Sequence, residues 1–330
     1  MARWIVKALV QRMIGFMPNP DYWSDLVQRK IAGSVDLTYP FFLSRLDVAR
    51  RNLDAFAREK GPAEDSPAEV LELGTGWFPI VPIALRLSGA SHVRTCDIVE
   101  HVSPERLCAT LQAFSRAADD GEWRRRFPSI NEPLLQHIRS FDPAHQTCVE
   151  SLLSLGVDYR VGDLPGASLP PASVDLIVSH AVLEYLSQPA FKELLDAFRR
   201  VLKSDGVMSH WIDFSDEYAY FDKSISPLNF LRYPDWVWRI INNPFIPLSR
   251  LRIDDVRRLF SGAGFSIHEE DCVRLDCDAM RKLPLAREFA NRHIEDMRVL
   301  DAWISARISP ADGSRDQVLD PAFCPPANLR

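Results

Sequence analysis

The sequence predicts an α/β fold, in which helices cover a doubly wound and largely parallel sheet. An apolar run at residues 70–73 breaks into Gly74 and Gly76, and an apolar, helical segment follows at 80–87. Three later runs also have the composition of strands: 93–97, 158–163 and 174–180. Because glycine has no Cβ, such a strand–turn–helix unit can turn sharply and approach a nucleotide-like ligand at the carboxyl end of the strand.

The segment ahead of the first strand, residues 1–66, is predicted to be a helical cap that ends in a linker rich in proline and polar residues. Its first 17 residues form an amphipathic pattern without an acidic residue. One helical face carries Ile5, Leu9, Met13 and Phe16, with Val6, Val10 and Met17 beside it. A helix of this type can lie on a membrane surface, but we expect its apolar stripe to pack on the protein's own body.

The remaining elements follow in order along the chain. The core, residues 67–213, is predicted to contain a helical insertion at 102–155, a helix at 191–202 and a fifth strand at 207–212. Residues 214–251 are rich in aromatic side chains and are predicted to form a lid. The C-terminal part of the core, 252–310, has a helix pattern at 253–261 and a strand pattern at 265–273. Residues 297–308 fit a last strand, although a helix over 295–307 also fits, and 311–330 are expected to be a loose tail.

Five segments, taken together and in order, resemble the class I S-adenosylmethionine-dependent methyltransferases. The sequence Glu-Leu-Gly-Thr-Gly at 72–76 matches the first motif, and Asp97 matches the acid that ends the second strand. The other matching segments are 162–163, 179–185 and 201–206. The resemblance implies a Rossmann-like, seven-stranded methyltransferase sheet with a late antiparallel strand pair. Phe78 stands where the family has its third glycine, and Ser-Asp-Gly at 204–206 replaces a Pro-Gly-Gly turn.

The resemblance also implies that S-adenosylmethionine is the cofactor. It assigns cofactor binding to Glu72, Gly74, Thr75, Gly76, Asp97, Ile98, Gly162, Asp163, Leu164 and Ser179. In this assignment Glu72 anchors the amino acid end, Asp97 accepts hydrogen bonds from the ribose hydroxyls, and Asp163 accepts from the adenine amino group. A nicotinamide-dependent oxidoreductase is the main alternative, but that fold prefers a third glycine for the pyrophosphate, where this chain has Pro79.

Methyl transfer from a sulfonium is an in-line displacement, so much of the catalysis can be positioning. A base is needed only where the acceptor must lose a proton. The candidates near strand ends are His180, His210 and Asp213. Candidates for acceptor binding in the lid are Tyr218, Tyr233 and Arg232. We expect a small-molecule acceptor with an oxygen nucleophile. An N-methyltransferase and a non-catalytic module that keeps the cofactor fold remain as alternatives.

Composition limits the partners. The net charge of −6 argues against a nucleic-acid partner, because general nucleic-acid binders are normally basic. Six cysteines lack paired metal-ligand spacing, so we expect reduced thiols in a cytoplasmic protein and no metal. No run of 18 apolar residues occurs, so no membrane-spanning helix is expected. The sequence leaves the oligomeric state open.

Overall fold

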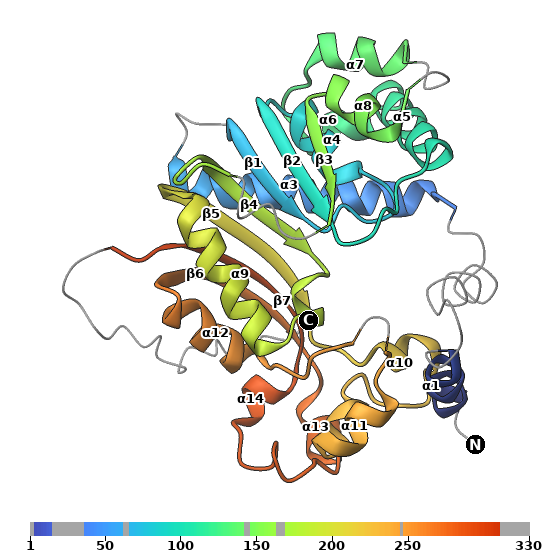
Figure 1. The fold of residues 1–330 in the computed structure, drawn as a ribbon, viewed down its shortest axis with the longest axis vertical. Coiled ribbons are helices and arrows are strands. Elements are labelled where there is room, and N and C mark those ends of the chain that lie inside the picture. The colour runs from blue at the N-terminus through green and yellow to red at the C-terminus, as the bar shows by residue number, and fades with distance from the viewer. Residues whose placement is uncertain are drawn as a thin grey trace, which may run out of the picture.

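A mixed sheet forms the centre of the protein (Figure 1). The computed structural model describes residues 3–14, 36–61, 66–141, 146–162, 169–244 and 247–310. Within them lies a seven-stranded sheet of order β3-β2-β1-β4-β5-β7-β6. The strands are β1 (Glu69–Leu73), β2 (His92–Asp97), β3 (Val157–Val161), β4 (Val174–His180), β5 (Leu202–Asp213), β6 (Phe265–Arg274) and β7 (Val299–Ile308). The first five are parallel, and β7 runs antiparallel to β5 and β6. The α/β fold and the late antiparallel pair are therefore confirmed.

Helices cover both faces of this sheet, α9 (Gln188–Val201) and α12 (Ile253–Gly262) on one and α3 (Tyr39–Lys60) on the other (Figure 1). Helix α3 begins at the N-cap Thr38, whose side chain accepts a hydrogen bond from the backbone N–H of Phe41. A stripe of buried residues runs along it at helical spacing: Phe42, Leu46, Ala49, Leu53 and Phe56. This stripe packs on the sheet and helps to form the larger of two hydrophobic clusters around it.

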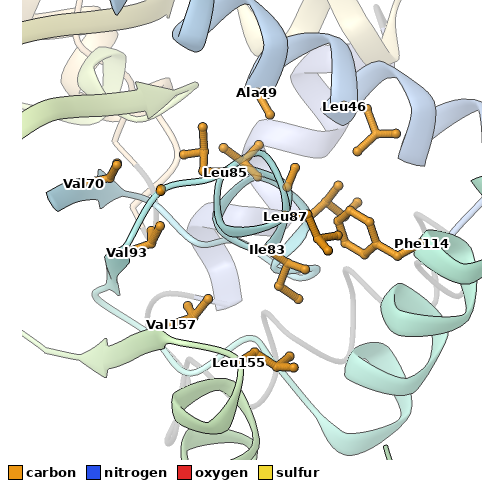
Figure 2. Close-up of a cluster of buried hydrophobic side chains, with 14 of the residues drawn as sticks. Leu46, Ala49, Val70, Ile83, Leu85, Leu87, Val93, Phe114, Leu155 and Val157 are labelled. Carbon is orange, nitrogen blue, oxygen red and sulfur yellow. The ribbon is translucent and has the colours of Figure 1, made fainter. Parts of the chain in front are cut away.

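Helix α4 (Ile80–Leu87) leaves the glycine turn after β1 and is buried over nearly all of its surface. Figure 2 shows Leu46 and Ala49 of α3 on one side of α4, and Val93 and Val157 of the sheet on another. A helix that is apolar all round is expected in such an interior position. Because α4 packs between α3 and the sheet, it holds the end of the glycine turn in place.

The long insertion between β2 and β3 is helical, as the sequence predicts. It contains α5 (Pro104–Asp119), α6 (Glu122–Arg126), α7 (Glu132–Arg139) and α8 (Cys148–Ser154). Helix α8 begins with a capping box, in which Thr147 and Glu150 satisfy each other's backbone N–H groups. The insertion packs on the side of the sheet that α3 and α4 cover.

Two details of the core and lid differ from the sequence-based expectation. Strand β5 starts at Leu202, directly after α9, so residues 203–206 belong to the strand and not to a separate turn. The lid contains α10 (Glu217–Phe221), η4 (Asn229–Arg232) and α11 (Asp235–Ile241). It shares its hydrophobic cluster with Met280, Phe289 and Met297, so residues from the predicted C-terminal part of the core also pack into the lid.

The first helix, α1 (Arg3–Ile14), packs on the lid, but not by the face that the sequence suggests. Trp4 and Ala8 are its buried residues, and the Trp4 ring lies 5.6 Å from the ring of Tyr218. Leu9 and Met13 are exposed, so the expectation that they pack on the body is wrong. Phe16 lies outside the described residues. The large Trp4 ring, which is one residue away from the predicted stripe, sets the orientation of the helix.

Within the described part of the chain, no helix is long and apolar enough to cross a bilayer.

Shortening one buried side chain of α4 tests the packing in Figure 2. Leu85→Ala should lower the free energy of unfolding by about 2–5 kcal/mol, because Leu85 is fully buried and its neighbours cannot fill the space. Denaturant unfolding measures the change. Leu153→Ala, at an exposed position on α8, should stay within about 0.5 kcal/mol of the parent. Equal effects of the two changes would contradict this account of the core.

Candidate functional site

The loop that follows β1 is held in a conformation that needs glycine. Gly74 and Gly76 have φ values of +86° and +68°, in the left-handed region that other residues rarely adopt. A Cβ at Gly74 would lie 2.3 Å from Cγ2 of Val182, so no side chain fits there. A Cβ at Gly76 would meet nothing within 4 Å, which leaves open space beside that residue for a ligand.

Glu72 lies beneath this loop, in a small buried hydrogen-bond network. Its Oε2 accepts from the hydroxyl of Thr95 at 2.5 Å, and the hydroxyls of Thr95 and Thr75 are 2.6 Å apart. Burial raises the pKa of Glu72 to about 8, and the nearby charge of Asp97 acts in the same direction. The side chain is therefore mostly protonated at neutral pH, and a cation placed beside it would favour loss of the proton.

Asp97, at the end of β2, ties the second strand to the glycine loop. Its Oδ2 accepts a hydrogen bond of 2.9 Å from the backbone N–H of Gly76. Among the described residues, none donates to its Oδ1, so this oxygen can accept from a ligand hydroxyl. The backbone carbonyl of Asp97 accepts from the N–H of Gly162 at 2.9 Å, which brings the end of β3 to the same edge.

An exposed apolar surface lies next to Asp97. Ile98 is 79% exposed and Val99 is 50% exposed, which is unusual for large apolar side chains beside a sheet. Three features of this edge together fit the nucleoside and amino acid parts of S-adenosylmethionine. They are an acid that can accept hydrogen bonds from a diol, an apolar side chain that can contact a flat ring, and the open space at Gly76. Glu72, Gly76, Asp97 and Ile98 would hold it. Asp163 and Leu164 lie outside the described residues.

Side chains alternate between the two faces of a strand, so the candidate residues from the sequence lie on different faces of the sheet. Ser179 and His210 lie on one face, and His180 lies on the other. Ser179 pairs with His210 across β4 and β5, and its hydroxyl lies 2.8 Å from His210 Nδ1. The His210 ring is fully buried between Phe198 of α9 and Phe260 of α12. Both side chains face the α9 and α12 side, within the core. Their burial gives no support to cofactor binding by Ser179 or to proton transfer by His210.

His180 faces the opposite side of the sheet, toward α3. It pairs with Trp211 of β5, and the two rings stack with centroids 4.4 Å apart. Nη1 of Arg45, from α3, lies 2.7 Å from His180 Nδ1. Burial and the charge of Arg45 lower the pKa of His180 to about 3, so the ring is neutral near pH 7. The same Nη1 is also 3.1 Å from His180 Nε2, so Arg45 lies within hydrogen-bond distance of both ring nitrogens.

Asp213 ends β5 on this same side. Residues two apart on a strand share a face, so Asp213 lies on the face of Trp211, one pleat nearer the strand end. It accepts from the hydroxyl of Tyr220 at 2.7 Å and from the backbone N–H of Ser215 at 2.8 Å. Asp213 pairs with Asp301 of β7, and Asp301 accepts from Trp211 Nε1. We call Arg45, His180, Trp211, Asp213 and Trp303 the strand-end cluster.

The three lid residues predicted to bind the acceptor lie in different surroundings. Tyr218 is buried, and its hydroxyl donates to the carbonyl of Ile241 at 2.6 Å. Tyr233 is half-buried, with its ring 5.7 Å from that of Trp4. Arg232 is exposed, with Nη1 3.3 Å from Oδ1 of Asn229. Both tyrosines thus hold α1 on the lid, and acceptor binding by these three residues stays a prediction.

Two charged groups near the strand ends, one half-buried and one buried, were not assigned to the site from the sequence. Arg45 contacts His180 and the ring of Phe41, and no described carboxylate pairs with it. Glu184, in η3 (Leu183–Tyr185), is buried with Oε2 unpartnered, and burial raises its pKa well above the ordinary value. It lines a small cavity with Asp213 and Ser249. In the sequence, Glu184 stands at a helix start, which gave an ambiguous signal. Nothing in the sequence distinguished Arg45 from the other arginines.

Comparisons with known proteins found one matching family model and several similar solved structures. Residues 130–209 match the family model described as a methyltransferase domain. A S-adenosylmethionine-dependent methyltransferase from Mesorhizobium loti is 16% identical, with a TM-score of 0.41, over 79% of this chain and 99% of that one. The 1,6-didemethyltoxoflavin-N1-methyltransferase of Burkholderia thailandensis is 14% identical, with a TM-score of 0.41, over 81% of this chain and 79% of that one. No curated protein matches the chain.

Cofactor binding should be coupled to loss of a proton from Glu72. S-adenosylmethionine carries an ammonium group, and a cation beside Glu72 would lower the pKa of about 8 and release the proton near pH 7. Calorimetry in buffers of different ionisation enthalpy should therefore give different apparent binding enthalpies. With Glu72→Gln the dependence on the buffer should disappear. A buffer-independent enthalpy for the parent protein would rule out this role of Glu72.

The buried His210 predicts a loss of stability in acid. Burial lowers its pKa to about 3 in the folded state, whereas the unfolded chain has the ordinary value near 6.5. Its contribution is present above about pH 6.5 and is lost as the pH falls toward 3, by up to about 1.4 kcal/mol per pH unit. His210→Asn should make the free energy of unfolding fall less steeply over this range. An unchanged slope would mean that His210 does not titrate on unfolding.

Proposed function

We propose that the chain is a class I S-adenosylmethionine-dependent methyltransferase and that it methylates an oxygen atom of a small-molecule acceptor. The observation that carries the proposal is the strand-end cluster. It combines a carboxylate, a neutral imidazole and a half-buried guanidinium at the carboxyl ends of β4 and β5. These ends lie beside the glycine loop of β1, where the cofactor, once bound, supplies an electrophilic methyl group.

A hydroxyl acceptor must lose its proton as it is methylated, so a base close to the oxygen assists the reaction. Asp213 supports this role, because its carboxylate ends β5 and is fixed by Tyr220 and Ser215. His180 supports a different role. Its neutral ring is held by Arg45 and stacked on Trp211 at the strand end, where it can contact and orient the acceptor. We therefore assign proton removal to Asp213 and orientation of the acceptor to His180 and Arg45.

A nitrogen acceptor is the second candidate, and the acidic groups around Asp213 favour it. Glu184 and Glu217 both lie near Asp213, and burial raises the pKa of each carboxyl group. A cationic amine would be attracted to this side of the site, and it must lose its proton before its lone pair can attack the methyl group. Oxygen remains the preferred acceptor, because a neutral amine attacks through its lone pair without a base, whereas a hydroxyl acceptor uses the carboxylate of Asp213.

Turnover of the variants separates the proposed roles. With a panel of small hydroxylated and amine acceptors, release of S-adenosylhomocysteine should identify a hydroxyl substrate. With that substrate Asp213→Asn should lower turnover by about 10²–10⁴-fold, while the affinity for S-adenosylmethionine stays within a few-fold. Tyr220→Phe, which keeps the ring and removes one hydrogen bond to Asp213, is the matched control and should retain most of the activity.

His180→Asn and Arg45→Lys should raise the KM for the acceptor more than they lower kcat, because these residues orient it. The pH–rate profile should keep its shape in both variants. A lost limb in His180→Asn would make His180 the base, contrary to the assignment above. Full activity of Asp213→Asn, or turnover with amines alone, would refute methylation of an oxygen that is assisted by Asp213.

A further inference from the structure

Helix α1 presents an apolar face to solvent. It packs on the lid through Trp4 and Ala8, whereas Val6, Leu9 and Met13 are 48%, 52% and 61% exposed. Residues three and four apart lie on one side of a helix, so these three side chains form one continuous stripe. The polar residue Gln11 lies near the packed side, within reach of the Tyr218 hydroxyl at 3.2 Å. The helix is therefore apolar on both its inner and its outer face.

The two lid helices that contact α1 also expose large apolar side chains. Helix α11 exposes Trp236 and Ile240, four residues apart, and α10 exposes Phe221. Seven of the fourteen exposed large apolar side chains among the described residues belong to these three short helices. We call Val6, Leu9, Met13, Phe221, Trp236 and Ile240 the lid surface. So strong a concentration of exposed apolar groups marks an interaction site.

Basic side chains surround the lid surface, although the whole chain carries a net charge of −6. Helix α1 contains Arg3, Lys7 and Arg12 and no acidic residue. Lys7 Nζ lies 5.2 Å from the ring centroid of Phe221. Lys223 follows α10, and its Nζ lies 5.2 Å from the centroid of the Tyr220 ring.

The acidic side chains nearby are paired with groups of the protein, although that of Asp235 is 54% exposed. Asp222 accepts from the backbone N–H of Trp4 at 3.3 Å, and Asp235 pairs with Arg239 and Arg250. This face is therefore locally basic, which complements an anionic partner.

We propose that the lid surface docks on the headgroup region of an anionic lipid bilayer. A short helix with outward apolar residues and flanking lysine or arginine lies in the plane of such an interface. An exposed tryptophan, here Trp236 at 68% exposure, is the side chain most suited to that depth. The docking concerns the outer side of the lid and is independent of the reaction proposed above.

A second copy of the chain is a less suitable occupant. In a two-fold contact the same patch of both copies meets. Arg3 and Lys7 of one copy would then approach their counterparts in the other. The like charges would oppose the contact, whereas anionic headgroups would neutralise them.

Flotation of the full chain with vesicles tests the proposal. The protein should float with phosphatidylserine–phosphatidylcholine vesicles, and much less with vesicles of phosphatidylcholine alone or at high salt. Leu9→Glu and Trp236→Glu should each lower the vesicle-bound fraction by about tenfold or more, because each change removes one buried apolar side chain from the interface. Leu153→Glu, at 56% exposure on α8, is the matched control and should float like the parent.

All variants change exposed positions, and unaltered binding of S-adenosylmethionine will show that they are folded. Flotation that is equal for the parent, Leu9→Glu and Trp236→Glu would overturn the lid surface as the docking site. A parent that does not float with either kind of vesicle would overturn lipid docking. A parent that sediments as a dimer, and a Leu9→Glu variant that sediments as a monomer, would assign the surface to a second copy instead.

Discussion

The strict alternation of side chains along β4 and β5 determines the chemistry of this site. Ser179 pairs with His210, and His180 pairs with Trp211, so neighbouring residues are directed to opposite faces of the sheet. One face is a closed core between α9 and α12, and it buries His210 completely. The other lies beneath α3 and receives Arg45. A shift of β4 by one residue would turn His180 to the side of α9 and α12 and bury the imidazole now beside Arg45.

Much of the fold could be predicted because the strands of the parallel part are short segments with β-branched or apolar residues that end at, or next to, a glycine or a polar residue. The sequence of these strands did not, however, show which face of the sheet each side chain occupies. β4 is covered on both sides, so the segment 174–180 shows no alternation of apolar and polar residues that would tell one face from the other. His180 and His210 therefore had equal standing as bases from the sequence. The hydrogen bond from Arg45 spans 135 residues, and no local pattern predicts such a contact.

The cofactor side was more predictable, since its geometry is local. Gly74 and Gly76 adopt positive φ values that few other residues tolerate, and Asp97 caps the N–H of Gly76 from the neighbouring strand. What the sequence could not supply is the electrostatic state of Glu72. From the sequence alone, the acidic residue of the first motif would be expected to be ionised. Burial under the loop raises its pKa to about 8, against the opposing effect of the hydrogen bond from Thr95.

Helix α10 links the outer surface of the lid to the reacting end of the sheet. Glu217 accepts from the hydroxyl of Tyr185 after β4, and Tyr220 donates to Asp213 at the end of β5. Between them Tyr218 packs on Trp4 of α1. The five residues of α10 thus contact α1 and both strand ends. A movement of α1 would therefore alter the contacts of Asp213, to which we assign proton removal. Because these contacts are hydrogen bonds and ring packing in a small cluster separate from the main core, they can rearrange without disturbing the sheet.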